Sequence, residues 1–364
     1  MKHLAWLPAL IALYGGLAQH RALRAYAAVP PVGRREPTDH PLVTIVVPAR
    51  DEAANLTELL PTLDALEYRP REVVVVDDDS TDATAAIASS RGARVVSTDG
   101  PPPAGWVGKP RACQLGAEAA AGEWLLFVDA DTRHAPRSLT AALARAQEDR
   151  LEVLSLLLDQ TLTSFWERLL LPFAYAGYFA GVDSLNTAPG DALVNGQYLL
   201  IRRTAYDRVG GHASVRASLV EDVALGSALV RAGCRVGLYR ADGLASVRMY
   251  RDRSSLFEGF AKNAFAFARL QPTRGVRVAA ATAGAAGALP IALALGRRWP
   301  LAGGVVLAVA ASAHARWARA FGAEATYGLL QPLAGFVFLA VALRGAVAAL
   351  GGPRVRWKGR RYRP

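Results

Sequence analysis

Carboxylate side chains follow two apolar runs of this chain, and their spacing suits metal and phosphate chemistry. Asp129 and Asp131 come directly after the apolar run 124–128, and the acidic cluster 77–79 follows the β-branched run 73–76. Carboxylates one residue apart at a strand end suit a hard divalent cation that keeps several waters and bridges a diphosphate. Either cluster alone is explained equally well as a polar turn that caps a helix. Two such clusters in one predicted sheet favour a binding site at its edge.

Charged residues also stand where two helices are expected to begin. Lys109 leads from a glycine- and proline-rich loop into a predicted helix over 111–121, where the ammonium and the helix N-terminus attract the same anion, such as a phosphate. A solvated surface lysine is the alternative. Glu221 and Asp222 precede a predicted helix over 223–232, and acidic residues there stabilise the helix dipole without any further role. Local sequence alone therefore leaves a structural explanation for each of these charges.

The elements that must position these residues alternate between strand and helix. Predicted strands at 43–47, 73–76 and 94–97 are separated by a helix over 53–66 and a second helix through Ala88. This βαβαβ pattern predicts half of a doubly wound α/β sheet. Neither a G-x-G-x-x-G turn nor a G-x-x-x-x-G-K-[ST] loop follows a strand, which disfavours a dinucleotide site and a P-loop.

The same alternation continues through the second half of the predicted sheet. His134, which follows the second acidic pair closely, is expected to be structural and not a ligand. Further strands are expected at 124–128, 151–158, 195–201 and 236–239, and further helices at 139–148 and 202–209.

The composition indicates a mixed soluble and membrane protein in a reducing compartment. Of 364 residues, 52% are hydrophobic, and the net charge is +11. The basic residues gather beside apolar segments and at the C-terminus, without a nucleic-acid motif, so we expect contact with an anionic membrane face and no nucleic-acid partner. Cys113 and Cys234 are far apart and lack metal spacing, which predicts buried thiols and no disulfide framework.

The N-terminal 24 residues predict a membrane anchor. The apolar stretch 4–18 is followed by more positive charge than precedes it, which favours an uncleaved segment whose following residues stay in the cytoplasm. A cleaved signal peptide is the alternative, since 25–27 faintly resembles a cleavage site. Residues 25–41 are rich in proline and charge and are expected to form a linker.

The C-terminal third predicts a transmembrane region over 276–350 and a basic cytoplasmic tail over 351–364. Its apolar segments are 278–296, 300–313 and 327–343. Three full spans would place the basic tail on the outer face, so one segment is expected to be re-entrant or interfacial, and 300–313 is the shortest. Trp357 and Tyr362 suit a headgroup-level anchor.

An aromatic and apolar segment at 165–179 is interrupted by Pro172 and is short for a membrane span. It predicts a helix that lies in the membrane interface. A buried core helix is the alternative for this segment.

With these pieces in order, the chain over 42–270 resembles the family-two inverting glycosyltransferases of GT-A fold. The resemblance rests on the run VTIVVPARDE at 43–52, the acidic cluster 77–82, the Asp129-Ala-Asp131 pair and Glu221-Asp222. The runs GWVGKP, VED, RMY and WKGRRY are similar to those of membrane-bound enzymes that glycosylate lipids, such as hopene-associated and carotenoid glycosyltransferases of the diaponeurosporenoate type and, more distantly, ceramide glucosyltransferases.

The resemblance implies an α/β fold, a GT-A-like doubly wound mixed sheet over 42–275, between the N-terminal membrane anchor and the C-terminal transmembrane helices. It implies a nucleotide-sugar donor, a lipid-phase acceptor, and bound Mg²⁺ or Mn²⁺. Asp222 matches the catalytic base, and Asp131 matches the metal ligand. The positions implied for nucleotide-sugar binding are Pro48, Glu52, Asp78, Lys109, Asp129 and Arg248.

The implied chemistry agrees with the residue types. A carboxylate such as Asp222 would take the proton of an acceptor hydroxyl as that oxygen attacks, and direct displacement would invert the anomeric configuration. The metal, with Lys109 or Arg248, would offset the charge that develops on the leaving nucleoside diphosphate. The sequence therefore predicts sugar transfer to a lipid hydroxyl or carboxyl at the cytoplasmic face of the cell membrane.

Three alternatives stay open at the level of sequence. A processive polysaccharide synthase is weakened because the Q-x-x-R-W motif of many relatives is replaced here by Arg248-Met-Tyr-Arg251, which leaves the role of Arg251 open. A sugar-phosphate nucleotidyltransferase should carry a glycine-rich turn where this chain has 48–52. A membrane scaffold built on an inactive transferase domain is disfavoured by the intact carboxylates.

Overall fold

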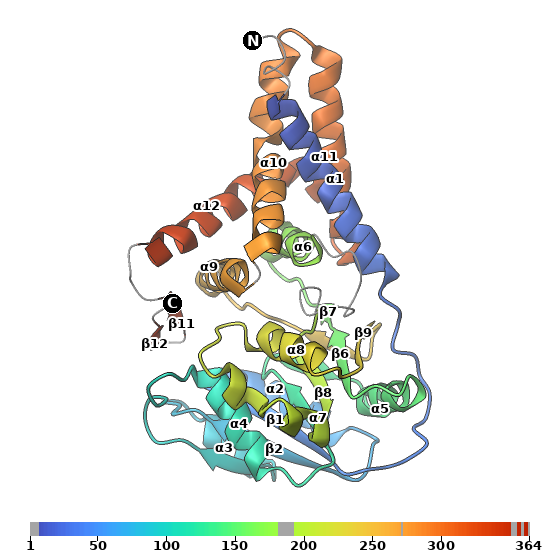
Figure 1. The fold of residues 1–364 in the computed structure, drawn as a ribbon, viewed down its shortest axis with the longest axis vertical. Coiled ribbons are helices and arrows are strands. Elements are labelled where there is room, and N and C mark those ends of the chain that lie inside the picture. Colours follow the sequence, from blue (N-terminus) through green and yellow to red (C-terminus); the bar gives the residue numbers. More distant parts are fainter. Residues whose placement is uncertain (1–6, 181–192, 271, 351–354, 358–359, 363–364) are drawn as a thin grey trace. The chain divides into compact units, whose positions relative to one another are not determined.

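The chain folds into two units that are interleaved in sequence. The computed structural model describes residues 7–180, 193–270, 272–350, 355–357 and 360–362. An α/β unit contains Val29–Thr161 and Ser184–Met249, and a helical unit contains Met1–Ala28, Leu162–Asp183 and Tyr250–Pro364. Figure 1 shows both units and labels many of their elements. All predicted carboxylate clusters lie in the α/β unit.

A seven-stranded mixed sheet forms the centre of the α/β unit, with the order β3-β2-β1-β4-β8-β6-β9. Strand β8 is antiparallel to both of its neighbours, and the other pairs are parallel. The predicted α/β class and mixed sheet are therefore confirmed. The strands are β1 (Val43–Ala49), β2 (Arg71–Asp77), β3 (Arg94–Ser97), β4 (Trp124–Val128), β6 (Val153–Leu157), β8 (Tyr198–Arg202) and β9 (Val236–Arg240).

The register of the central strands brings the acidic ends together. Ala49 of β1 pairs with Asp77 of β2, and Val46 of β1 pairs with Phe127 of β4. The apolar runs of these strands are buried almost completely, as expected for parallel strands covered on both faces. Both acidic clusters consequently follow the carboxyl ends of parallel strands at one edge of the sheet.

Helices pack against the sheet through the apolar faces that the sequence predicts. In α2 (Ala53–Asp64) the buried side chains are those of Leu56, Leu59, Leu60 and Leu63. Helix α4 (Gly108–Ala119) approaches β1 so closely that a Cβ added to Gly116 would lie 2.3 Å from Cγ1 of Val46. The remaining helices of this unit are α3 (Thr84–Ser90), α5 (Ser138–Glu148), α7 (Arg203–Arg208), η3 (Gly211–Val215) and α8 (Glu221–Arg231).

A small second sheet, which the sequence did not predict, has the order β5-β10-β7. Its strands are β5 (Thr132–His134), β7 (Asp159–Gln160) and β10 (Ala245–Val247), each too short to show an apolar period. The pairing of β5 with β10 places Arg248 beside the second acidic pair, and the backbone N–H of Arg248 donates to the carbonyl of Asp131 at 3.2 Å.

The helical unit is held together by very close helix contacts. Helix α1 (Leu7–Ala28) crosses α10 (Pro272–Gly296) where a Cβ on Gly284 would lie 2.2 Å from the carbonyl oxygen of Ile11. Small residues at such crossings let two backbones approach, as in many membrane helix pairs. The unit also contains α6 (Phe165–Phe179), α9 (Arg253–Leu270), α11 (Pro300–Ala320), η4 (Ala325–Leu330), α12 (Gln331–Leu350), β11 (Val355–Trp357) and β12 (Arg360–Tyr362).

Two helices of the described chain are long and apolar enough to cross a membrane, namely Val276–Gly296 and Pro300–Ala320. Their length and composition alone support a membrane span. The expectation that the segment from Pro300 is the shortest is wrong, since α11 continues to Ala320 and has 21 residues. The N-terminal anchor and the orientation of the tail remain predictions. The side chains of Trp357 and Tyr362 lie outside the described part of the structure.

Helix α6 begins and ends at the residues that the sequence predicts for it. Ser164 and Glu167 form a capping box at its start, which satisfies two backbone N–H groups. Leu169, Leu170 and Phe173 are buried, and the helix packs against α1, α11 and α12. This burial favours the alternative of a core helix over an interfacial one.

Candidate active site

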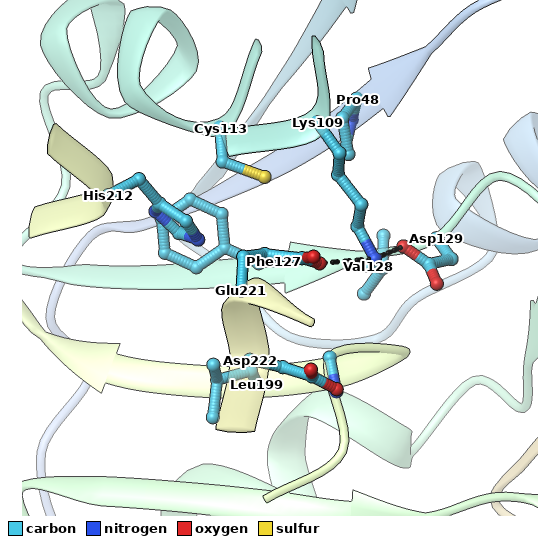
Figure 2. A pocket seen from close by; sticks show the side chains of 11 residues that line it. Pro48, Lys109, Cys113, Phe127, Val128, Asp129, Leu199, His212, Glu221 and Asp222 are labelled. Carbon is cyan, nitrogen blue, oxygen red and sulfur yellow. Dashed lines mark hydrogen bonds and ion pairs between the residues drawn. The ribbon is translucent and has the colours of Figure 1, made fainter. Parts of the chain in front are cut away.

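A hollow lies at the carboxyl ends of β1 and β4, beside the first turns of α4 and α8 (Figure 2). The space among its walls amounts to about 260 Å³ when the adjoining solvent-open space is included. Its walls bring together residues that are far apart in the sequence. They are Pro48, Lys109, Cys113, Phe127, Val128, Asp129, Gly196, Leu199, His212, Glu221 and Asp222.

Lys109 is the cation of this hollow, and it lies between two carboxylates. Its Nζ is 2.7 Å from Oδ1 of Asp129 and 2.9 Å from Oε1 of Glu221, as the dashed lines of Figure 2 show. Burial disfavours the charge of Lys109, but the carboxylates of Asp129, Glu221 and Asp222 outweigh burial and hold the lysine pKa well above its usual value. The ammonium is therefore permanently charged and already engaged with protein groups.

Asp222 stands in the first turn of α8, with its carboxylate held by backbone donors. Its Oδ2 accepts from the N–H of Gly196 at 2.9 Å, and its Oδ1 accepts from the N–H of Val223 at 2.9 Å. Burial, followed by repulsion from Glu221, raises the pKa of Asp222 to about 6, although Lys109 and the two backbone donors act in the opposite direction. Such a carboxylate is ionised at neutral pH and has a basicity suited to proton transfer.

The other acidic pair is divided between two environments. Asp129 lines the hollow and pairs with Lys109, whereas Asp131 does not line it and instead lies at the β5–β10 junction beside Arg248. Within the described ranges, no group of three His, Cys, Asp or Glu side chains is placed to hold a metal ion. Two carboxylates at a strand end still fit Mg²⁺ or Mn²⁺, because such cations often take one or two protein carboxylates and fill the remaining positions with waters and substrate phosphates.

Three of the residues predicted for nucleotide-sugar binding, Pro48, Glu52 and Asp78, lie at or just after the ends of β1 and β2, and of these three only Pro48 reaches the hollow. Asp78 is 5% exposed and accepts from the hydroxyl of Thr98 at 3.3 Å. Glu52 accepts from the side-chain amide of Asn55 at 2.5 Å. Glu52 and Asp78 therefore lie near the ends of β1 and β2 but do not line the hollow.

Asp82 serves as a cap. Its carboxylate accepts from the N–H of Ala53, the first residue of α2, and from the N–H of Thr84, the first residue of α3, each at 3.0 Å. These bonds hold two helix starts in place and lower the pKa of Asp82 against the effect of burial. Both oxygens of the Asp82 carboxylate therefore accept hydrogen bonds from helix N-termini.

His134 is buried, as expected for a structural histidine. Its Nε2 lies 2.9 Å from the hydroxyl of Thr132, and burial, assisted by Arg133, lowers its pKa to about 3. The ring is consequently neutral.

Several residues of the hollow were not identified from the sequence, namely Cys113, Phe127, Gly196, Leu199 and His212. Only Cys113 and His212 are of types that can take part in chemistry. The sequence predicts no more than a buried thiol for Cys113, and His212 follows a glycine pair without a motif. Cys113 is buried, and that burial raises its pKa well above the usual value, so its thiol is protonated.

Comparison with known proteins finds similar sequences. Residues 44–210 match the model of the glycosyl transferase family 2. A 4,4'-diaponeurosporenoate glycosyltransferase from Staphylococcus haemolyticus is 30% identical over 240 residues, covering 63% of this chain and 63% of the relative. The enzyme of the same name from Staphylococcus aureus is 30% identical over 238 residues, covering 62% and 61%. The chain thus spans less than two thirds of the length of these relatives.

A solved structure shows the same fold over most of the chain. The mannosyltransferase PcManGT from Pyrobaculum calidifontis, in complex with GDP-Man and Mn²⁺, aligns with a TM-score of 0.57 over 93% of this chain and 99% of its own. Sequence identity is 20%, so the likeness concerns the fold alone.

Proposed function

Because residues 44–210 match the model of the glycosyl transferase family 2, we propose that this protein is an inverting glycosyltransferase that uses a nucleotide-sugar donor. The sugar passes to a hydroxyl or carboxyl of a lipid-phase acceptor at the cytoplasmic face of the cell membrane. The observation that carries the proposal is the carboxylate of Asp222, which shares one hollow with Asp129 and has a raised pKa.

Asp222 is proposed as the general base. As the acceptor oxygen attacks the anomeric carbon, Asp222 takes its proton, a step that contributes roughly 10²–10⁴-fold in rate. The N–H groups of Gly196 and Val223 fix the carboxylate, so no reorganisation is needed during the reaction. Attack from the side opposite the leaving diphosphate forms one C–O bond as the other breaks, and the configuration inverts.

The leaving-group side is assigned to the end of β4. Asp131, with Asp129, would hold Mg²⁺ or Mn²⁺, which when bound offsets charge on the leaving nucleoside diphosphate. The backbone N–H of Arg248 donates to the carbonyl of Asp131, and the positive side chain of Arg248 is proposed to act on the same diphosphate. Pro48, Glu52 and Asp78, at the ends of β1 and β2, are proposed to line the nucleoside pocket.

A carotenoid-type acid or alcohol is the proposed acceptor class. The proposal is supported by relatives whose names specify diaponeurosporenoate, together with two helices able to cross a membrane. An apolar polyene dissolves in the bilayer, so an enzyme acting on its polar end benefits from membrane attachment. The alternative of a processive polysaccharide synthase predicts a polymer in place of a singly glycosylated lipid.

Lipid mass spectrometry of a carotenoid-producing host tests the function. Cells that express the wild-type chain should contain one lipid class heavier by a single hexose or pentose, and cells that express Asp222→Asn at the same level should not. Nuclear magnetic resonance of the product should show the anomeric configuration opposite to that of the donor. Lipids that stay unchanged at verified expression, or a ladder of repeated sugar additions, would refute the proposal.

A further inference from the structure

His212 lines the hollow, and no motif of the sequence assigns it a role. It is the second residue of η3 and is 2% exposed. Its ring packs edge-on against the ring of Phe127, with the ring centroids 4.8 Å apart. Figure 2 shows the imidazole beside Cys113, on the side of the hollow away from Asp129. Its position is therefore set by packing within the α/β unit.

A relay of hydrogen bonds controls one ring nitrogen of His212. The Nδ1 atom lies 2.9 Å from the hydroxyl of Tyr206, and that oxygen also accepts from the backbone N–H of His212 at 3.0 Å. The Tyr206 hydroxyl in turn lies 3.1 Å from Oε1 of Gln114. The side-chain amide of Gln114 has a fixed orientation, because its Oε1 accepts from the N–H of Ala213 and its Nε2 donates to the carboxylate of Glu118.

This relay selects the tautomer of His212. Tyr206 has one hydroxyl proton, and Oε1 of Gln114 can only accept a hydrogen bond. If Tyr206 donates this proton to Gln114, no contact of the relay joins two acceptors. The Tyr206 oxygen must then accept from Nδ1–H of His212. In a neutral imidazole with the proton on Nδ1, the other nitrogen, Nε2, is a hydrogen-bond acceptor. Among the described residues, none forms a hydrogen bond with Nε2 of His212. The imidazole ring of His212 borders the hollow.

Burial keeps the imidazole of His212 neutral. Burial lowers the pKa of His212 to about 4, with Lys109 acting in the same direction and Glu221 against it. The groups that face it from neighbouring elements are Lys109 and Cys113 of α4 and Glu221 of α8. At neutral pH the imidazole is consequently an uncharged acceptor and not a cation for phosphate.

We propose that His212 is a specificity-determining residue, whose Nε2 accepts a hydrogen bond from a hydroxyl group of the sugar being transferred. This inference rests on the proposed function and deepens it. The sugar of the donor must lie between the leaving-group side at Asp129 and the base Asp222, which is the hollow that His212 borders.

The chemistry of the hollow fits a polyol. Apart from the Lys109 ammonium, its charged and polar side chains are acceptors, namely the carboxylates of Asp129, Glu221 and Asp222 and the His212 imidazole. Sugar hydroxyls supply the donors that such walls require. Phe127 and Cys113 provide an apolar surface suited to the C–H face of a pyranose.

Two amide substitutions separate the roles of the two ring nitrogens. In His212→Asn the amide replaces Nδ1 and leaves no acceptor at the position of Nε2, whereas in His212→Gln the amide reaches that position. Calorimetry in Mn²⁺ would compare UDP-glucose with UDP, and GDP-mannose with GDP, on the full chain in detergent. His40→Phe, at an exposed histidine outside the hollow, is the matched control.

For the nucleotide sugar that the wild type binds, His212→Asn should weaken affinity about tenfold and leave the affinity for the free diphosphate unchanged. His212→Gln should recover most of the loss, and His40→Phe should match the wild type. One deoxy-sugar analogue should bind wild type and His212→Asn equally, which identifies the hydroxyl.

The outcomes are distinguishable. Equal losses for sugar and diphosphate in His212→Asn, or no loss at all, would overturn the assignment of His212 while leaving the transferase proposal in place. If wild-type protein binds neither diphosphate nor either nucleotide sugar, the proposed function and this inference both fail. Melting temperatures of the variants exclude misfolding as the cause of a loss.

Discussion

The ammonium nitrogen of Lys109 lies 2.7 Å from Oδ1 of Asp129. The sequence predicts that both residues bind the nucleotide sugar, with Lys109 near the diphosphate, yet in the folded chain they neutralise each other. Glu221 approaches the same ammonium at 2.9 Å, so one cation organises the two sides of the hollow. Lys109 therefore has a structural role, because it forms ion pairs with Asp129 and Glu221 within the protein itself.

Replacing Lys109 by Met should destabilise the α/β unit. Asp129 and Glu221 would lose their shared counter-ion, and a buried carboxylate without its partner is costly. With 35% of the Lys109 side chain exposed, solvent screens part of this effect, so we expect a loss of about 1–3 kcal/mol. Thermal unfolding in detergent measures it, and Lys109→Arg, which retains the charge, is the control. A Met variant as stable as the wild type would contradict the structural role.

Asp222→Asn should abolish sugar transfer and preserve donor binding. The amide is the same size as the carboxylate but cannot take a proton, so kcat should fall roughly 10²–10⁴-fold. Initial rates of sugar transfer, together with calorimetry of the nucleotide sugar, check both parts. An Asn variant with more than a tenth of wild-type kcat would remove Asp222 from the role of base.

The pH dependence of kcat/KM should report the ionisation of Asp222. The base is active when deprotonated and its pKa is raised to about 6, so activity should be full above this value and decline as pH falls through it. Glu221→Gln removes a neighbouring negative charge that raises this pKa, and the acid limb should move to lower pH. Rates between pH 4.5 and 8.5 for both proteins decide the matter. An acid limb that stays in place in Glu221→Gln would argue against Asp222 as the titrating group.

Divalent metal should be required, with Asp131 as the more important of the paired carboxylates. Chelation should abolish transfer, and added Mn²⁺ or Mg²⁺ should restore it. Asp131→Asn should raise the Mn²⁺ concentration for half-maximal rate by more than about tenfold. Asp129→Asn should have a smaller effect, because Lys109 already engages Asp129. Full activity in the presence of a chelator would exclude this arrangement.

Gly196→Ala should misplace the base. A Cβ at this position would lie 2.9 Å from Cβ of Asp222 and 3.1 Å from its Oδ2, so the carboxylate must shift. A displacement of a fraction of an ångström at a reacting group should reduce kcat by roughly tenfold or more, with little change in donor affinity. Gly304→Ala, where an added Cβ meets no atom within 4 Å, is the matched control. Equal rates for both variants would show that Gly196 does not position Asp222.

Much of the sheet could be predicted because its signal is local. The run 124–128 forms β4 at the predicted residues, and the four leucines of α2 are buried as their spacing indicates. The strands β5, β7 and β10 were missed because two or three residues carry no apolar period. Their pairing depends on contacts between distant segments, and it places Arg248 beside Asp131.

The sequence by itself determined the two acidic strand ends, because β-branched runs must be buried and their carboxyl ends must share an edge in a parallel sheet. It also placed Asp222 at a helix start, through local charge and capping patterns. Only the tertiary structure decided that Lys109 bridges Asp129 and Glu221, that Gly196 holds Asp222, and that His212 borders the same hollow. The physical reason is that ion pairs and hydrogen bonds act over about 3 Å, and only chain folding brings these segments to that distance.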